Sequence, residues 1–133
     1  MTTTPVATRK LDVLIVDDDQ LVADTLCQIL NTFGFNAYCA YSGPQAIHHA
    51  TYAPFDVLIT DVVMTGMTGI EAAFEIWKVL PNCKVLLVSG HQATAHLLRA
   101  AQERGHDFEV LAKPVYPAVI IERLKAIGSR ALQ

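Results

Sequence analysis

The chain has 133 residues, of which 10 are basic and 13 acidic, so its formal net charge at neutral pH is −3. Hydrophobic residues make up 52% of the chain and charged residues 17%, a composition that can bury a core and that excludes a disordered protein. A mildly acidic chain without a run of Lys or Arg also argues against direct binding to nucleic acid or to an anionic membrane surface.

The hydrophobic pattern predicts five strand and helix pairs in one domain. Residues 1–9 are polar and rich in Thr, which is typical of a flexible tail, so we expect the domain to cover residues 10–133. Short apolar runs with β-branched residues predict strands over residues 11–16, 36–40, 56–60, 84–88 and 108–112. Apolar residues at helical spacing predict helices over residues 22–33, 44–50, 70–80, 93–104 and 117–127.

Glycine and proline mark the expected helix ends. The first helix carries an apolar face that runs from Val22 to Phe33, and Gly34 ends it. Pro44 and Pro117 stand in the first turns of the second and fifth helices, where the missing N–H of proline is tolerated.

The expected strands are nearly continuous apolar runs, such as VLIV at residues 13–16 and VLLV at residues 85–88. Runs of this kind are typical of a parallel sheet that is covered by helices on both faces. Because crossovers between parallel strands are right-handed, the alternation predicts a doubly wound α/β domain of (βα)5 type. Ligands of such domains bind outside the carboxyl ends of the strands.

Chemically active side chains follow four of the expected strands. Asp17 and Asp18 follow the first strand, Asp61 the third, Ser89 the fourth and Lys113 the fifth. Since the carboxyl ends of parallel strands meet at one edge, we expect these side chains to share a shallow cleft. Clustered carboxylates repel one another unless a proton or a cation joins them, and an all-oxygen site with few protein ligands suits Mg²⁺.

The same residues suggest phosphoryl transfer onto a carboxylate. A carboxylate can attack phosphorus and form an acyl phosphate when a metal and an ammonium group neutralise the transferring oxygens, roles that fit Asp61, Mg²⁺ and Lys113. Ser89 can donate a hydrogen bond to a phosphoryl oxygen, and Gly90 leaves room for the group to enter. No Gly-rich phosphate-binding motif occurs, so an NTPase or a dinucleotide-dependent enzyme is not expected.

Four motifs resemble those of the receiver domain of two-component response regulators, in the same order along the chain. They are LIVDDD at residues 14–19, VLITDVVMTGMTG at 57–69, LLVSG at 86–90 and LAKP at 111–114. The resemblance covers about residues 10–127 and implies a flavodoxin-like sheet with the strand order 2-1-3-4-5, as in chemotaxis receivers.

The resemblance also implies a role for each matching residue. Asp61 is then the phospho-acceptor, Asp17 and Asp18 hold Mg²⁺ (Mn²⁺ being an alternative), and the backbone carbonyl of Val63 completes the protein ligands. Lys113 pairs with the phosphoryl group and precedes a cis peptide bond, and Ser89 is the hydroxyl that moves onto the phosphoryl group.

Partners and location follow from the same resemblance. The phosphoryl donor is expected to be a phosphohistidine on a histidine kinase or phosphotransfer protein, and small acyl phosphates are possible substitutes. The fourth and fifth helices carry few charges over residues 93–101 and 118–127, which favours an interaction face there. The resemblance implies that the fourth strand, fourth helix and fifth strand form the interaction surface for a downstream protein or a second copy of the chain. We expect a cytoplasmic protein, because the sequence shows neither a signal peptide nor an apolar run of membrane-spanning length.

The chain departs from the usual receiver pattern at several positions. Val110 stands where an aromatic residue commonly precedes the lysine by three positions, so a signal is expected to travel through Ser89 and its loop or through another aromatic, Phe108 or Tyr116. Thr65 replaces a common proline after the acceptor. Two positions that tune hydrolysis of the acyl phosphate hold Val63 and His91, which favours a long-lived phospho-form.

Two other functions stay open at this point. The chain could be a receiver-like interaction module that is not phosphorylated, or a small phosphohydrolase that uses Asp61 as its nucleophile. The acidic set with Ser89 and Lys113 argues against the first, and Val63 argues against the second because it cannot act as a general acid or base. Asp19 or Gln20 is expected to cap the first helix. The three cysteines are far apart and form no C-x-x-C motif, which argues against disulfides and a zinc site and favours buried apolar roles for Cys27, Cys39 and Cys83.

Overall fold

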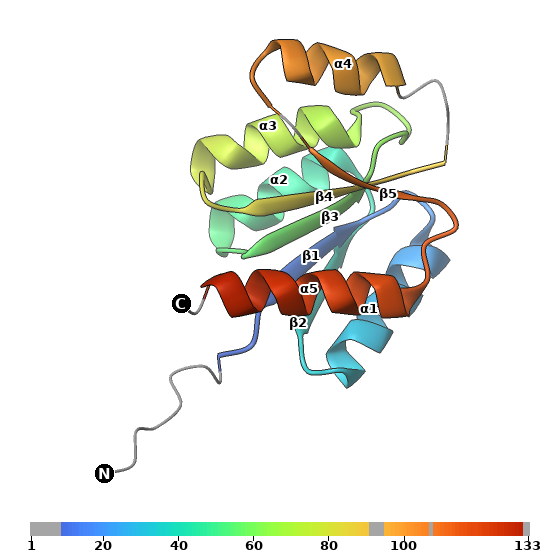
Figure 1. Ribbon diagram of the computed structural model, residues 1–133, viewed down its shortest axis with the longest axis vertical. Helices are drawn as coiled ribbons and strands as arrows, with labels where there is room; N and C mark the ends of the chain where they lie inside the picture. Colours follow the sequence, from blue (N-terminus) through green and yellow to red (C-terminus); the bar gives the residue numbers. More distant parts are fainter. Residues whose placement is uncertain (1–8, 91–94, 107, 132–133) are drawn as a thin grey trace.

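The computed structural model describes residues 9–90, 95–106 and 108–131, in which strands and helices alternate along the chain (Figure 1). The strands are β1 (Asp12–Val16), β2 (Asn36–Ala40), β3 (Val57–Asp61), β4 (Lys84–Ser89) and β5 (Glu109–Ala112). The helices are α1 (Gln20–Thr32), α2 (Gly43–Tyr52), α3 (Gly69–Val79), α4 (Ala95–Glu103) and α5 (Pro117–Ala131).

The five strands form one parallel sheet in the order β2-β1-β3-β4-β5, which confirms the expected fold. The register pairs Val16 of β1 with Thr60 of β3, and Asp61 of β3 with Val88 of β4. The three central strands therefore end at nearly the same level. The residues that end or follow them are brought to one edge of the sheet.

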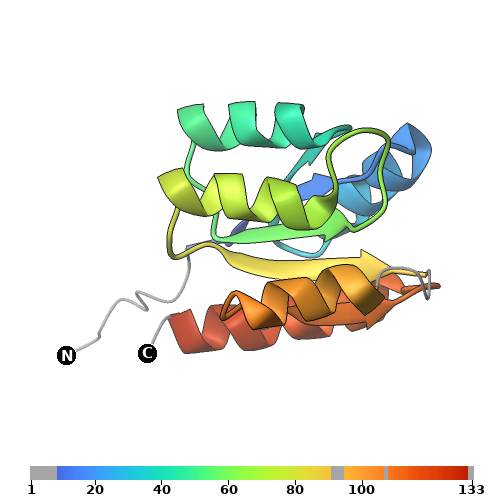
Figure 2. The same cartoon turned by 90° about the horizontal axis from the view of Figure 1, so that it is seen from above.

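Two hydrophobic cores lie on opposite faces of the sheet (Figures 1 and 2). Helices α2, α3 and α4 cover one face, and α1 and α5 cover the other. Successive residues of β1 alternate between the cores: Leu14 packs with the first and Ile15 with the second, and neither is more than 2% exposed. This burial on both faces explains the continuous apolar runs of the strands.

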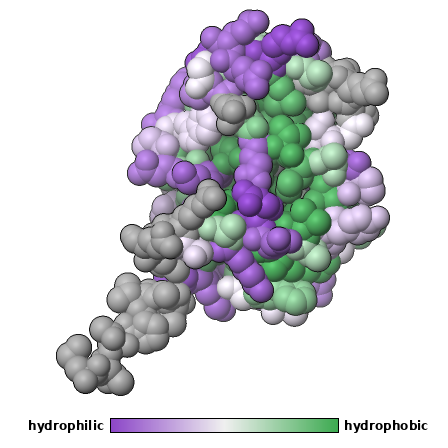
Figure 3. Space-filling view, viewed as in Figure 1, coloured by the Kyte–Doolittle hydropathy of each residue, from purple (hydrophilic) through white to green (hydrophobic). Residues whose placement is uncertain are grey.

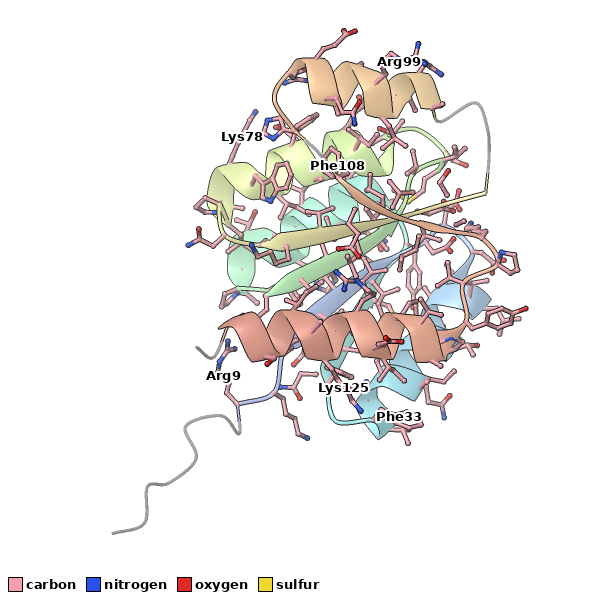
Figure 4. All side chains as sticks on the ribbon, in the orientation of Figure 1. Arg9, Phe33, Lys78, Arg99, Phe108 and Lys125 are labelled. Atoms are coloured by element: carbon pink, nitrogen blue, oxygen red, sulfur yellow. The ribbon has the colours of Figure 1, made fainter. Side chains whose placement is uncertain are left out.

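The apolar face expected for α1 is only partly correct. Ala23 and Leu30 are buried against the sheet, whereas Val22 is 48% exposed and Phe33 is 58% exposed. Phe33 follows the last turn as the C-cap and points away from the sheet (Figure 4). Helical spacing therefore identified the helix, but the stripe that touches the sheet is narrower than the sequence pattern.

Polar side chains cap α1 and α3, the helices that follow β1 and β3. Asp19 caps α1 by accepting a hydrogen bond from the N–H of Val22, as expected. Thr68 and Glu71 form a capping box at the start of α3, which the sequence analysis did not identify. These caps fix where the loops after β1 and β3 end and where the helices begin.

The beginning of the described chain is tied to the sheet. Arg9 lies in the segment expected to be a tail, and its guanidinium donates to both carboxylate oxygens of Asp56, at 3.0 and 3.1 Å. His91 and the first residues of the expected fourth helix, 93 and 94, lie outside the described residues. Within the described part, no helix is long and apolar enough to cross a membrane.

Gly69 allows α3 to start directly against the end of β3. A Cβ atom at this position would lie 2.1 Å from the backbone oxygen of Asp61 and 2.9 Å from Oγ1 of Thr60. No side chain fits at these distances, so the backbone contact that positions Asp61 requires glycine here.

Replacing Gly69 with alanine is therefore expected to lower the free energy of unfolding by about 1–3 kcal/mol, because β3 and α3 must move apart. Urea unfolding measures this loss. Gly128→Ala in α5 is the matched control, since its Cβ would meet only the side chain of Leu11, with the nearest atom, Cδ1, at 3.3 Å. A loss at position 69 that is no larger than at position 128 would contradict the close-approach argument.

Candidate functional site

Three acidic side chains and one lysine meet at the carboxyl edge of the sheet. Asp17 follows β1, Asp61 is the last residue of β3, and Lys113 follows β5. Together with Asp18 they line an open hollow of about 890 Å³ between α1 and the first turn of α5. A larger hollow of about 1130 Å³ at the opposite end of the sheet contains no comparable cluster among its described lining residues.

The three carboxylates are close enough to share a cation. Asp17, Asp18 and Asp61 each offer one oxygen, and these oxygens lie within 4.8 Å of one another. Asp17 and Asp61 are only 9% and 7% exposed, whereas Asp18 is exposed. Such a set of hard oxygen ligands, open to solvent on one side, suits Mg²⁺ or Mn²⁺.

Lys113 partly neutralises this cluster. Its Nζ lies 2.8 Å from Oδ2 of Asp61. Partial burial lowers the pKa of Lys113, but the hydrogen bond to Asp61 and the charges of the three carboxylates outweigh it, so the pKa is raised above its ordinary value. The ammonium group is therefore charged at neutral pH.

The other carboxylate oxygen of Asp61, Oδ1, has a different environment from Oδ2. Oδ1 is buried and has no hydrogen-bond partner among the residues that the structure describes. A buried carboxylate oxygen without a partner is costly unless another group binds it. This oxygen fits a metal ligand or a nucleophile, and its environment supports a cation in the cleft.

Burial also perturbs Asp17. Removal from water raises the pKa of Asp17 above its ordinary value, the hydrogen bond from the backbone N–H of Asp19 opposes this shift, and the charge of Asp61 adds to it. The chain thus holds a carboxylate where the charged form is disfavoured, as expected for a group that binds a cation.

Hydrogen bonds orient the other two carboxylates. Oδ1 of Asp17 accepts from the N–H of Asp19 at 2.9 Å. Oδ2 of Asp18 accepts from both the N–H and the hydroxyl of Thr65, at 3.1 and 3.3 Å. The contact with Thr65 was missed by the sequence analysis, because no local pattern links residues 47 positions apart.

The remaining expected residues lie around the same edge. Val63 lines the hollow, and Ser89 ends β4, where its carbonyl accepts from the N–H of Lys113 at 3.0 Å. Gly90 also lines the hollow, and a Cβ there would lie 3.1 Å from Cβ of Lys113. The peptide bond between Lys113 and Pro114 is cis, as the resemblance implied.

Known proteins share this sequence pattern and fold. The family model of the response regulator receiver domain matches residues 13–125. The chemotaxis protein CheY of Thermotoga maritima is 31% identical over 117 residues, which cover 87% of this chain and 96% of that protein. A solved CheY-like receiver domain from Methanospirillum hungatei superimposes with a TM-score of 0.82 at 25% identity, covering 92% of this chain and 96% of that one.

Some relatives are much longer proteins. A cyclic di-GMP phosphodiesterase of Thermotoga maritima is 32% identical over 105 residues, which are 79% of this chain but 27% of that protein. The matched region of such relatives is thus confined to one part of their length. Because the family model spans most of this chain and its fold is that of the solved relatives, the chain belongs to the receiver domains of two-component response regulators.

Proposed function

We propose that this receiver accepts a phosphoryl group on Asp61 in a reaction that depends on Mg²⁺. The observation that carries the proposal is the asymmetry of the Asp61 carboxylate. One oxygen is paired with Lys113 at 2.8 Å, while the other is buried without a partner among the described residues. Such a carboxylate is oriented and still has an oxygen available for phosphorus or for a metal.

Asp17, Asp18 and Asp61, with the backbone carbonyl of Val63, would hold the cation. When bound, Mg²⁺ or Mn²⁺ supplies positive charge against the oxygens of the incoming phosphoryl group. The mutual distance of the three carboxylate oxygens, within 4.8 Å, supports this assignment. The response regulator protein TrrA of Thermotoga maritima, which has the same fold, was solved in complex with Mg²⁺-BeF.

Lys113 and Ser89 assist the transfer. A carboxylate oxygen of Asp61 forms a bond to phosphorus while the bond from phosphorus to the donor breaks, and Lys113 neutralises charge on the transferring oxygens. The side chain of Lys113 is 38% exposed, which leaves its ammonium group room to shift from the Asp61 carboxylate to an oxygen of the phosphoryl group bound there. Ser89, at the end of β4, donates its hydroxyl to the phosphoryl group and thereby reports its presence to the following loop.

The donor in this proposal is a phosphohistidine on a histidine kinase or phosphotransfer protein. The output surface is formed by β4, α4 and β5, where Val110 is 37% exposed. The face that carries α4, β5 and α5 displays hydrophobic as well as hydrophilic residues (Figure 3). A downstream protein or a second copy of the chain is expected to bind there when Asp61 is phosphorylated.

A phosphohydrolase is a weaker candidate. Turnover of an aspartyl phosphate requires a positioned general acid or base. Two residues after Asp61 stands Val63, which is 44% exposed and carries no ionisable group. An interaction module without phosphorylation would not require Asp61, Lys113 and the paired carboxylates to be arranged as observed.

Incubation with acetyl phosphate and Mg²⁺ is expected to add one phosphoryl group to the natural chain and none to Asp61→Asn. Intact-mass measurement detects the adduct, and omission of Mg²⁺ should abolish it. Asp24→Asn, outside the cleft, is the matched control and should be phosphorylated normally. No mass gain in the natural chain, together with no binding of beryllofluoride, would refute phosphorylation and favour the interaction module.

Lys113→Met is expected to separate cation binding from phosphoryl transfer. Removing the ammonium group should tighten Mg²⁺ binding by about threefold to tenfold, because it repels the cation. It should also slow phosphorylation by at least about tenfold, since charge on the transferring oxygens is no longer neutralised. Titration calorimetry and timed mass spectra measure the two effects, with Lys125→Met, at an exposed position of α5, as the control. Weaker Mg²⁺ binding together with an equal loss in the phosphorylation rate would contradict the role of Lys113 in phosphoryl transfer.

Asp17→Asn is expected to stabilise the metal-free protein by about 1 kcal/mol, because it removes a buried negative charge next to Asp61. The same change should abolish measurable Mg²⁺ binding. Urea unfolding without metal and calorimetry with Mg²⁺ test the two statements. Asp19→Asn, which retains the helix cap, should change neither. A destabilised Asp17→Asn variant would show that charge repulsion does not dominate at this position.

A further inference from the structure

We propose that Thr65 is a positioning residue for the cation site: its backbone N–H and hydroxyl hold the Asp18 carboxylate beside Asp17 and Asp61 and thereby set the affinity for Mg²⁺. The inference rests on the proposed function, because it concerns the same cation site. It adds Thr65, a residue of the loop after β3. Its side chain is neither a proposed ligand of the cation nor a group that takes part in phosphoryl transfer.

The contact itself is specific. Both donors of Thr65 converge on one oxygen, Oδ2 of Asp18, with N···O and O···O distances of 3.1 and 3.3 Å. Hydrogen bonds to a charged acceptor are stronger than those between neutral groups. Proline, the residue common at this position in receivers, has neither donor, so this chain holds its exposed aspartate by a contact that the usual residue cannot make.

The loop that carries Thr65 is anchored on both sides. Before it, the N–H of Val62 donates to the carbonyl of Val88 at 3.1 Å. After it, the N–H of Gly69 donates to the carbonyl of Val62 at 2.9 Å, which closes the loop on itself, and the Thr68 capping box starts α3. Met64 is 7% exposed and packs into the first core. The donors of Thr65 are therefore presented from a fixed backbone.

Among the three carboxylates, Asp18 depends most on these hydrogen bonds for its orientation. Asp17 is buried and accepts from the N–H of Asp19, and Asp61 is buried and paired with Lys113. Asp18 is exposed, and two like charges face it. Without a restraint, repulsion would turn its side chain into solvent, and cation binding would then have to order it again.

The two hydrogen bonds leave room for a cation. An ionised carboxylate offers about four lone-pair positions, and Thr65 uses two of them. Donors around a carboxylate ligand commonly fix its orientation, and their removal weakens metal binding. The contact is thus expected to prepare the site for Mg²⁺ rather than to compete with it.

The experiment titrates Mg²⁺ into the full chain by calorimetry, without any phosphoryl donor. Thr65→Ala removes the hydroxyl and is expected to weaken Mg²⁺ binding by about threefold to tenfold. Thr65→Ser keeps both donors and should bind within about twofold of the natural chain. The urea midpoint without Mg²⁺ should be the same for all three proteins, which separates positioning of the ligand from a merely structural role.

The possible results separate the role of Thr65 from the existence of the cation site. Unchanged or tighter Mg²⁺ binding by Thr65→Ala would overturn the inference, as would weakening in Thr65→Ser that equals that in Thr65→Ala. A lower urea midpoint of metal-free Thr65→Ala that accounts for its weaker binding would assign Thr65 a structural role instead. If the natural chain binds no Mg²⁺, or if Asp18→Asn binds it equally well, the proposed cation site itself fails. Mg²⁺ binding by the natural chain with an unaffected Thr65→Ala would refute only the role of Thr65.

Discussion

The concentration of negative charge at the carboxyl edge of a buried sheet is the constraint on which this structure depends. Asp17 and Asp61 are 9% and 7% exposed, and their oxygens lie within 4.8 Å of each other and of Asp18. Like charges at that distance oppose folding. Burial adds to this cost, because it disfavours the charged form of Asp17 and raises its pKa. The pair between Lys113 and Asp61 offsets only part of this repulsion. The fold therefore holds a site whose charge balance favours an added cation.

The parallel sheet supplies the force that holds these groups together. Strands β1 and β3 are buried on both faces, so a slip in their register would disrupt the packing of Leu14 in the first core and of Ile15 in the second. Because Asp17 and Asp61 lie at the ends of these strands, the register fixes their positions relative to each other. Gly69 adds a direct contact between α3 and the backbone of Asp61. Hydrophobic burial far from the cleft thus stabilises an arrangement that electrostatics alone would disperse.

The hydrophobic pattern predicted the parallel sheet and the meeting of Asp17, Asp61 and Lys113, because strand ends follow from periodicity and parallel strands share a carboxyl edge. The strand order was implied by the resemblance to receiver domains. The sequence could not predict contacts made by loops. The bonds from Thr65 to Asp18 depend on the path of the chain between Val62 and Gly69, which no repeating pattern encodes. The exposure of Phe33 was missed for a similar reason, since helical spacing does not show how wide a stripe the sheet covers.

The aromatic side chains bear on how a change at Asp61 could reach the surface. Phe108, next to β5, stacks on Trp77 with ring centroids 5.4 Å apart and an interplanar angle of 7°. Trp77 in turn donates from Nε1 to the carbonyl of Cys83 at 2.8 Å. A ring held this way cannot swing without breaking a packed cluster at the amino end of the sheet. Tyr116 lies three residues beyond Lys113 and is 66% exposed, so its ring, unlike that of Phe108, is not enclosed in a packed cluster.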